Sequence, residues 1–92
     1  MLGERINELR CAFGWSQVEL AKKLQVTKQT ISNWENDNIQ PSIDMLVKVA
    51  GVFNVTTDYL LGLESVPRIN VEGLPVEVVA HLVQFIEDYR NK

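Results

Sequence analysis

Residue types that enzymes and metal sites depend on are nearly missing from this chain of 92 residues. It has one cysteine, Cys11, and one histidine, His81, seventy positions apart. A metal site needs several clustered ligands and a disulfide needs two cysteines, and no glycine-rich loop is present to cradle a phosphate. The sequence therefore predicts no enzyme activity, no metal site and no cofactor. Cys11 is interpreted as a packing residue or an idle thiol, and a metal or pH-sensing role for His81 is the one alternative left open.

Long apolar runs are also missing. No uninterrupted apolar stretch, counting glycine, is longer than that of Val49–Phe53, whereas a helix that crosses a bilayer needs about 20 apolar residues. The first residues, Met1 to Arg5, lack the apolar core of a signal peptide. A single cysteine fits a reducing compartment. These features predict a protein that enters no membrane and works in the cytoplasm.

Basic charge is scarce as well. Nine lysines and arginines stand against twelve acidic residues, giving a net charge of −3, which argues against bulk electrostatic attraction to nucleic acid. The exception is local, because the charged residues between Leu20 and Trp34 are Lys22, Lys23 and Lys28, with no acid among them. This window is either a small positive face or three separately solvated lysines.

What the sequence has is a succession of short amphipathic helices. Apolar residues recur at spacings of three and four from Leu2 to Phe13, and a capping residue precedes each later segment. The caps are Ser16, Thr27, Ser42 and Thr56. Glu19, three residues after the first cap, completes a capping box. The pattern predicts five helices, at about 2–13, 17–24, 28–35, 43–53 and 57–61.

The apolar faces of these helices predict one shared core. The second and third helices contribute Leu20, Ala21, Leu24, Val26, Ile31 and Trp34. The fourth helix is expected to turn inward with Ile43, Leu46, Val47, Ala50 and Phe53. Only Gln25 and Val26 separate the second helix from the cap of the third, so two short helices must meet at a sharp angle.

The third predicted helix leaves a polar face outward. Its members are Lys28, Gln29, Ser32 and Asn33. Lysine can donate to guanine O6 and N7, and glutamine or asparagine can pair with adenine N6 and N7. A helix with such side chains at its N-terminal end fits the major groove of B-DNA. The same side chains would also suit a plain solvated face.

Caps, core positions and surface positions follow one another in a specific order over residues 2–62. The segments that show it are Gln17-Val18-Glu19-Leu20-Ala21, Thr27-Lys28-Gln29-Thr30-Ile31-Ser32-Asn33-Trp34-Glu35, Pro41-Ser42 and Asp58-Tyr59-Leu60-Leu61-Gly62. This order resembles the phage-repressor/Cro-type (XRE-like) helix-turn-helix family. The resemblance implies an all-α fold, with a five-helix lambda-repressor-like DNA-binding domain. It also implies a transcriptional regulator, in particular a repressor, that binds a pseudo-palindromic operator as a homodimer.

The resemblance further implies roles for individual residues. Bases would be read by Lys28, Gln29 and Asn33. The DNA backbone would be met by Ser16, Gln17, Thr27, Thr30, Asn36 and Asn38, the last two through backbone N–H groups of their segment. Arg10 and Glu35 would form a structural pair between the first and third helices.

Two departures from the family pattern are visible. Gln25 stands where relatives place glycine, so we expect it to adopt a positive φ. The loop after Glu35 carries no lysine or arginine, which weakens the expected affinity for DNA more than it weakens the functional assignment. Gln17 also has a simpler interpretation, as a solvated residue in the first turn of its helix.

The rest of the chain lies outside the family pattern. Residues 63–73 have no clear period and are predicted to be a flexible linker. Residues 74–92 are predicted to hold an additional C-terminal amphipathic helix opened by Leu74-Pro75. Its broad apolar stripe consists of Val78, Val79, Leu82, Phe85, Ile86 and Tyr89. Such a stripe predicts a dimerisation element, and the alternatives are packing on its own domain or binding another protein.

The leading hypothesis is therefore a sequence-specific transcriptional regulator with a DNA-binding domain over residues 1–62. Its partner would be double-stranded DNA, bound by a homodimer with helix 28–35 of each subunit in the major groove. Two alternatives stay open. One is the antitoxin of a toxin–antitoxin pair, whose C-terminal segment binds a toxin. The other is a protein-interaction module on the same fold, which the acidic balance favours slightly.

Overall fold

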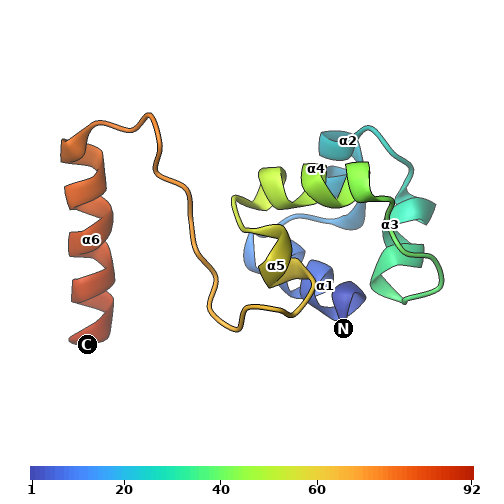
Figure 1. Cartoon of the computed structure of the whole chain (residues 1–92), viewed down its shortest axis with the longest axis horizontal. Coiled ribbons are helices and arrows are strands. Elements are labelled where there is room, and N and C mark those ends of the chain that lie inside the picture. Colours follow the sequence, from blue (N-terminus) through green and yellow to red (C-terminus); the bar gives the residue numbers. More distant parts are fainter.

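The computed structural model describes all 92 residues and contains six α-helices and no strands. The helices are α1 Leu2–Ala12, α2 Gln17–Leu24, α3 Lys28–Glu35, α4 Ile43–Phe53, α5 Thr57–Leu60 and α6 Val76–Arg90. The first five gather into one bundle, and α6 stands apart at the end of a long connection (Figure 1). The predicted all-α architecture of five helices and a C-terminal helix is confirmed. None of the six helices combines the length and the hydrophobicity needed to cross a bilayer.

Side-chain caps fix where four of these helices begin. Each cap hydroxyl accepts the backbone N–H three residues further on, at 3.0–3.2 Å. The caps are the predicted ones, Ser16, Thr27, Ser42 and Thr56. At α2 the box is complete, because the Glu19 carboxylate accepts from the Ser16 N–H at 3.0 Å. The hydrogen bond from the Ser16 backbone N–H is the main cause that lowers the pKa of the Glu19 carboxyl.

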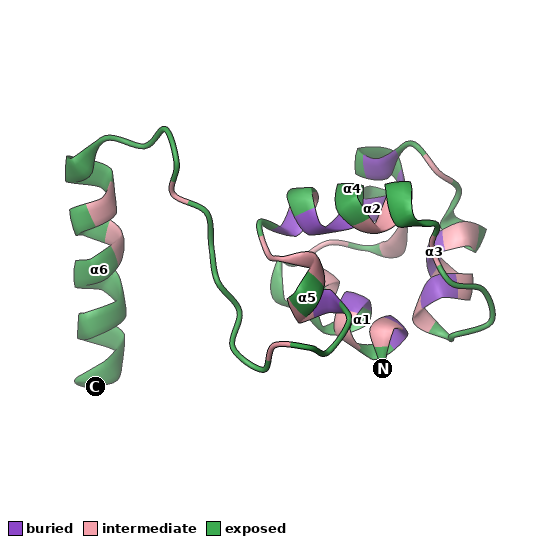
Figure 2. Cartoon of the chain, in the orientation of Figure 1, coloured by how far each residue is buried: buried purple, intermediate pink, exposed green.

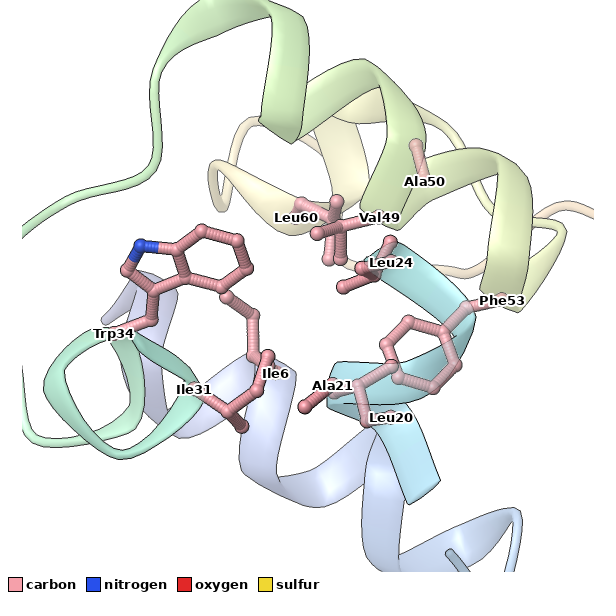
Figure 3. Close-up of a cluster of buried hydrophobic side chains, with 10 residues drawn as sticks. All are labelled: Ile6, Leu20, Ala21, Leu24, Ile31, Trp34, Val49, Ala50, Phe53 and Leu60. Carbon is pink, nitrogen blue, oxygen red and sulfur yellow. The ribbon is translucent and has the colours of Figure 1, made fainter. Parts of the chain in front are cut away.

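One hydrophobic core lies between the five helices of the bundle (Figure 2). It consists of Ile6, Leu20, Ala21, Leu24, Ile31, Trp34, Val49, Ala50, Phe53 and Leu60. These side chains come from all five helices and converge on one volume (Figure 3). Trp34 is only 4% exposed, as expected for a core residue. Cys11 is free and exposed, so of its two interpretations the idle thiol is the one that remains.

The inward face of α4 differs from the predicted one. Ile43 and Val47 are 80% and 57% exposed, whereas Val49, which the sequence analysis did not select, is fully buried. The helix packs on α2 and α5 through the row that contains Val49, Ala50 and Phe53. Because α4 is apolar around most of its circumference, helical periodicity alone does not select the row that is buried.

The turn between α2 and α3 depends on a left-handed residue. Gln25 has φ 58° and ψ 43°, as predicted. The N–H groups of Gln25 and Val26 donate to the carbonyls of Lys22 and Ala21 at 3.2 and 2.9 Å, which is the hydrogen-bond pattern of a Schellman motif. This turn delivers the chain to the Thr27 cap and so sets the direction of α3.

The connection between α5 and α6 has no regular structure, as predicted, but it is tied to the bundle at two points. The Thr56 hydroxyl donates to the Glu64 carboxylate at 2.9 Å. Further along, the Asn54 side chain accepts from the N–H of Asn70 at 2.9 Å and donates to its carbonyl at 3.2 Å. We call this second contact the Asn54–Asn70 clasp. The segment up to residue 70 is therefore anchored to the bundle by side-chain hydrogen bonds at Glu64 and at Asn70.

Replacing Gln25 by glycine should stabilise the protein. A left-handed residue with a Cβ costs roughly 1 kcal/mol or more, and the greater unfolded-state entropy of glycine removes part of that gain. We expect the free energy of unfolding, measured by chemical denaturation, to rise by about 0.5 kcal/mol. Gln25→Ala is the matched control, because alanine keeps the left-handed strain. A glycine variant no more stable than the alanine variant would contradict this explanation.

Candidate nucleic-acid interface

The outward side of α3 carries the side chains predicted to read bases. Lys28 and Gln29 are exposed and Asn33 is half-buried, while Ile31 and Trp34 on the opposite side are in the core. The Gln29 amide donates to the Asn33 amide oxygen at 3.1 Å, one helical turn away. Helix α3 thus turns polar side chains outward and is held against the bundle by the buried Ile31 and Trp34.

The residues predicted to meet the DNA backbone fall into two groups. The Ser16 and Thr27 hydroxyls already serve as helix caps, and Thr27 also shares a hydrogen bond with Thr30 at 2.9 Å. Asn36 and Asn38 are exposed in the loop after α3.

The N–H groups of the loop after α3 are not available in the way predicted. The Asn36 N–H donates to Ser32 O at 3.0 Å, and the Asn38 N–H donates to Asn33 O at 2.9 Å. These bonds arise because the loop continues the last turn of α3, where N–H groups find helix carbonyls. At these two positions the donors left for a phosphate are the Asn38 side-chain amide and the one N–H of the Asn36 amide that is not given to Ser32 Oγ.

Glu35, at the end of α3, binds side chains from two other helices. Arg10 on α1 donates from Nε and Nη2 at 2.6 and 3.0 Å, so the predicted pair is present. Asn7 on α1 and Gln17 on α2 donate to Glu35 Oε1 at 2.9 and 3.1 Å. The Glu35 side chain is 5% exposed. We call these four residues the Glu35 cluster, and it joins α1, α2 and α3 at one carboxylate.

Two members of the Glu35 cluster were not found from the sequence as partners of Glu35. Asn7 was not selected at all, although it lies three residues before Arg10, a spacing that places both on one side of α1. Gln17 was selected for contact with phosphate only. In the structure one amide N–H of Gln17 points inward to Glu35, so the interpretation of Gln17 as a merely solvated residue is wrong.

The electrostatics of the Glu35 cluster follow from its geometry. Burial raises the pKa of Glu35, but the hydrogen bonds from Arg10, Asn7 and Gln17, with the charge of Arg10, outweigh burial and lower that pKa below its ordinary value. The hydrogen bond to Glu35 likewise raises the pKa of Arg10, although burial opposes it. Both side chains are therefore ionised near neutral pH.

A close approach fixes the C-terminal end of α3 on the first turn of α1. The Gly3 N–H donates to the Asp37 carboxylate at 3.1 Å. A Cβ at Gly3 would overlap the carbonyl oxygens of Trp34 and Glu35, so only glycine fits there. Both ends of α3 are thus held, by the Gln25 turn at one end and by α1 at the other.

Of the three lysines between Leu20 and Trp34, one makes a contact within the chain. The Lys23 ammonium lies over the Trp15 ring, 4.4 Å from its centroid, a cation–π contact within the chain. Lys22 and Lys28 are exposed. The positive charge near α3 is therefore modest, and the outward groups beside it are mostly uncharged hydrogen-bonding side chains.

A short helix–turn–helix pair, α2 and α3, with the second helix presented on the surface of a five-helix bundle, defines a helix-turn-helix DNA-binding protein. Residues 6–60 match the family model described as Helix-turn-helix. The chain belongs to this family, in its phage-repressor/Cro-type (XRE-like) branch of transcriptional regulators.

Curated relatives share this assignment. The HTH-type transcriptional regulator ImmR of Bacillus subtilis is 37% identical over 87 residues, which cover 95% of this chain and 68% of ImmR. The uncharacterized regulator YobD of the same organism is 33% identical over 72 residues, 78% of this chain and 64% of YobD. The chain thus spans about two thirds of the length of these relatives. Their names are those of regulators and not of enzymes.

Solved structures similar to this one include complexes with DNA. SinR, the master regulator for biofilm formation, in complex with DNA is 40% identical, with a TM-score of 0.62 over 66% of this chain and 98% of that one. The P22 c2 repressor with a synthetic operator is 30% identical, with a TM-score of 0.63 over 65% and 91%. A SinR–SinI protein complex is 26% identical, with a TM-score of 0.63 over the whole of both chains.

Acid should lower the free energy of unfolding of the protein by protonating Glu35. Because the pKa of Glu35 is lower in the folded state, its contribution to stability is present above about pH 4.5, its ordinary value, and is lost as the pH falls through the folded value. Glu35→Gln should therefore lower the free energy of unfolding at pH 7 and make its decline below pH 4.5 shallower. Urea denaturation at a series of pH values measures both effects. Glu8→Gln, an exposed carboxylate on α1, is the matched control, and an equal flattening in that variant would contradict the assignment to Glu35.

Proposed function

We propose that this protein is a sequence-specific transcriptional repressor that binds a pseudo-palindromic operator as a homodimer, with α3 in the major groove. The observation that carries the proposal is the outward polar face of α3 on a helix fixed at both ends. SinR and the P22 c2 repressor, which share the fold, were solved with DNA, and this supports a DNA target. A DNA-binding role would place the protein where the chromosome lies, which in bacteria such as the source of ImmR is the cytoplasm.

Gln17 is proposed to bind a phosphate with the N–H that it does not give to Glu35. A primary amide has two N–H groups, and the Glu35 cluster uses one of them. The other is then oriented by the same carboxylate. A donor placed at the start of α2 also benefits from the positive end of the helix dipole. Thr30 and the amides of Asn36 and Asn38 are proposed as further contacts with the DNA backbone.

The dimer is proposed to form through α6. No residue of α6 is buried in the single chain, and the helix does not lie on the bundle (Figure 1), so this structure does not favour the alternative of packing back. Its exposed apolar residues include Val83, Phe85, Ile86 and Tyr89. Half-sites one helical turn apart, about 34 Å, need two coupled recognition helices. Coupling also raises the effective concentration, which compensates for the small positive charge.

A second function, binding of another protein through the C-terminal part, is favoured by one finding. The match that extends over the whole chain is a complex of two proteins, SinR and SinI. An antitoxin or an adaptor role would use α6 for a different partner in place of a second copy. The two proposals predict different masses for the purified protein: a dimer if α6 pairs with a second copy, and a monomer if α6 binds a different partner.

Two substitutions distinguish backbone contacts from base contacts. Gln29→Ala should cost about 1–3 kcal/mol on the selected operator and little on random duplex. Gln17→Ala should weaken both to the same extent, because phosphate contacts carry no base information. Fluorescence anisotropy over a range of salt concentrations measures these affinities, and binding of the unsubstituted protein should weaken log-linearly with salt. Salt-independent binding, or no DNA binding, would support the protein-interaction alternative.

A charge in the middle of the apolar stripe should separate the subunits. Leu82→Lys is expected to give a folded monomer with much weaker operator binding, because the stripe cannot be buried with an unpaired ammonium at its centre. Light scattering gives the mass and circular dichroism shows that the helices are retained. Gln84→Lys, on the polar side of α6, is the matched control and should remain dimeric. A dimeric Leu82→Lys protein, or a monomeric unsubstituted protein at high concentration, would rule out this arrangement.

A further inference from the structure

Two side chains on the outward face of α3, Gln29 and Asn33, are hydrogen-bonded to each other. The Gln29 amide nitrogen donates to the Asn33 amide oxygen at 3.1 Å. Residues four apart on a helix are neighbours on its surface, and neither side chain is used in the core. The pair is therefore a feature of the recognition face itself and not of the packing beneath it.

This bond changes what Gln29 can offer to a base. A free glutamine amide has two N–H donors and one carbonyl acceptor. With one N–H given to Asn33, Gln29 keeps one donor and one acceptor on the same planar amide. The major-groove edge of adenine presents the complement, the N7 acceptor and the N6 donor, whereas the edge of guanine presents two acceptors, N7 and O6. A bidentate contact with guanine would need both N–H groups of Gln29.

We propose that Asn33 is a positioning residue that restricts Gln29 to adenine, so that α3 selects an A·T base pair where Gln29 meets the major groove. The inference rests on the proposed function, because it assumes α3 in the groove. Asn33 keeps its own two N–H donors, which face acceptors on a neighbouring base or phosphate. The base preference at the base pair that Gln29 meets is thus set by two side chains, although only Gln29 contacts that base pair.

The experiment begins with the full chain and a randomised duplex library. Selection by the unsubstituted protein gives the preferred operator, and selection by Gln29→Ala identifies the base pair at which preference disappears. Affinities are then measured for duplexes that differ only at that base pair. We expect adenine to be preferred over guanine there by roughly 5- to 150-fold, the discrimination of one good bidentate contact.

Two variants of Asn33 separate positioning from direct reading. Asn33→Ala removes the acceptor, frees the second N–H of Gln29 and should bring the adenine-to-guanine ratio close to one. Asn33→Asp keeps an acceptor for Gln29 and should keep the ratio, although its charge weakens binding to all duplexes alike. The control is Gln84→Ala, which removes a bond of the same kind, from Gln84 to Asp88 at 2.9 Å on α6, and should leave the ratio unchanged. Thermal unfolding of each variant shows that it is folded.

Each outcome has one meaning. A ratio lost in Asn33→Ala and kept in Asn33→Asp supports the proposal. A ratio unchanged in Asn33→Ala, a ratio lost equally in both variants, or an operator with guanine at the Gln29 position overturns it while leaving the proposed repressor function intact. If the unsubstituted protein selects no duplex, the proposed function itself fails, and the inference fails with it.

Discussion

The ionised carboxylate of Glu35 is the contact on which the arrangement of the first three helices depends. It is almost fully shielded from water and accepts four N–H groups from three side chains. A buried carboxylate without a charged partner would be strongly destabilising; Arg10 supplies the opposite charge, and Asn7 and Gln17 add one hydrogen bond each. Because the carboxylate belongs to the last residue of α3, the position of the recognition helix is set by polar contacts as well as by the core behind it.

The same arrangement explains how an acidic chain can present a DNA-binding surface. Attraction through bulk charge is not available at a net charge of −3, and one of the nearby lysines lies over Trp15. Under the proposed function, Gln17 and Gln29 supply orientation in its place, because each donates one N–H to a neighbouring side chain and keeps a second N–H for DNA. Donors fixed in this way lose less conformational entropy on binding than free side chains do.

The features that depend on residues close together in the sequence could be predicted. The features that depend on residues far apart in the sequence could be predicted only in part. The four caps and the buried Trp34 follow from local spacing and capping chemistry, and the left-handed Gln25 follows from the family resemblance, because relatives place glycine there. The inward face of α4 could not be chosen, because Ile43, Val47 and Val49 are equally apolar and only packing distinguishes them. Asn7 and the loop N–H groups after α3 were missed, since their hydrogen bonds are visible only once helices and turns are placed. Base contacts and the role of α6 remain predictions.

The Asn54–Asn70 clasp limits where α6 can go. Were residues 63–75 free, α6 could begin anywhere within the reach of thirteen extended residues. With Asn70 held at the end of α4, only residues 71–75 are left as a tether, and five residues extend to roughly 17 Å at most. The start of α6 therefore lies within roughly 17 Å of Asn70 while the clasp is formed. If two copies pair through α6 as proposed, a tether of this length limits how far apart the two α3 helices can lie.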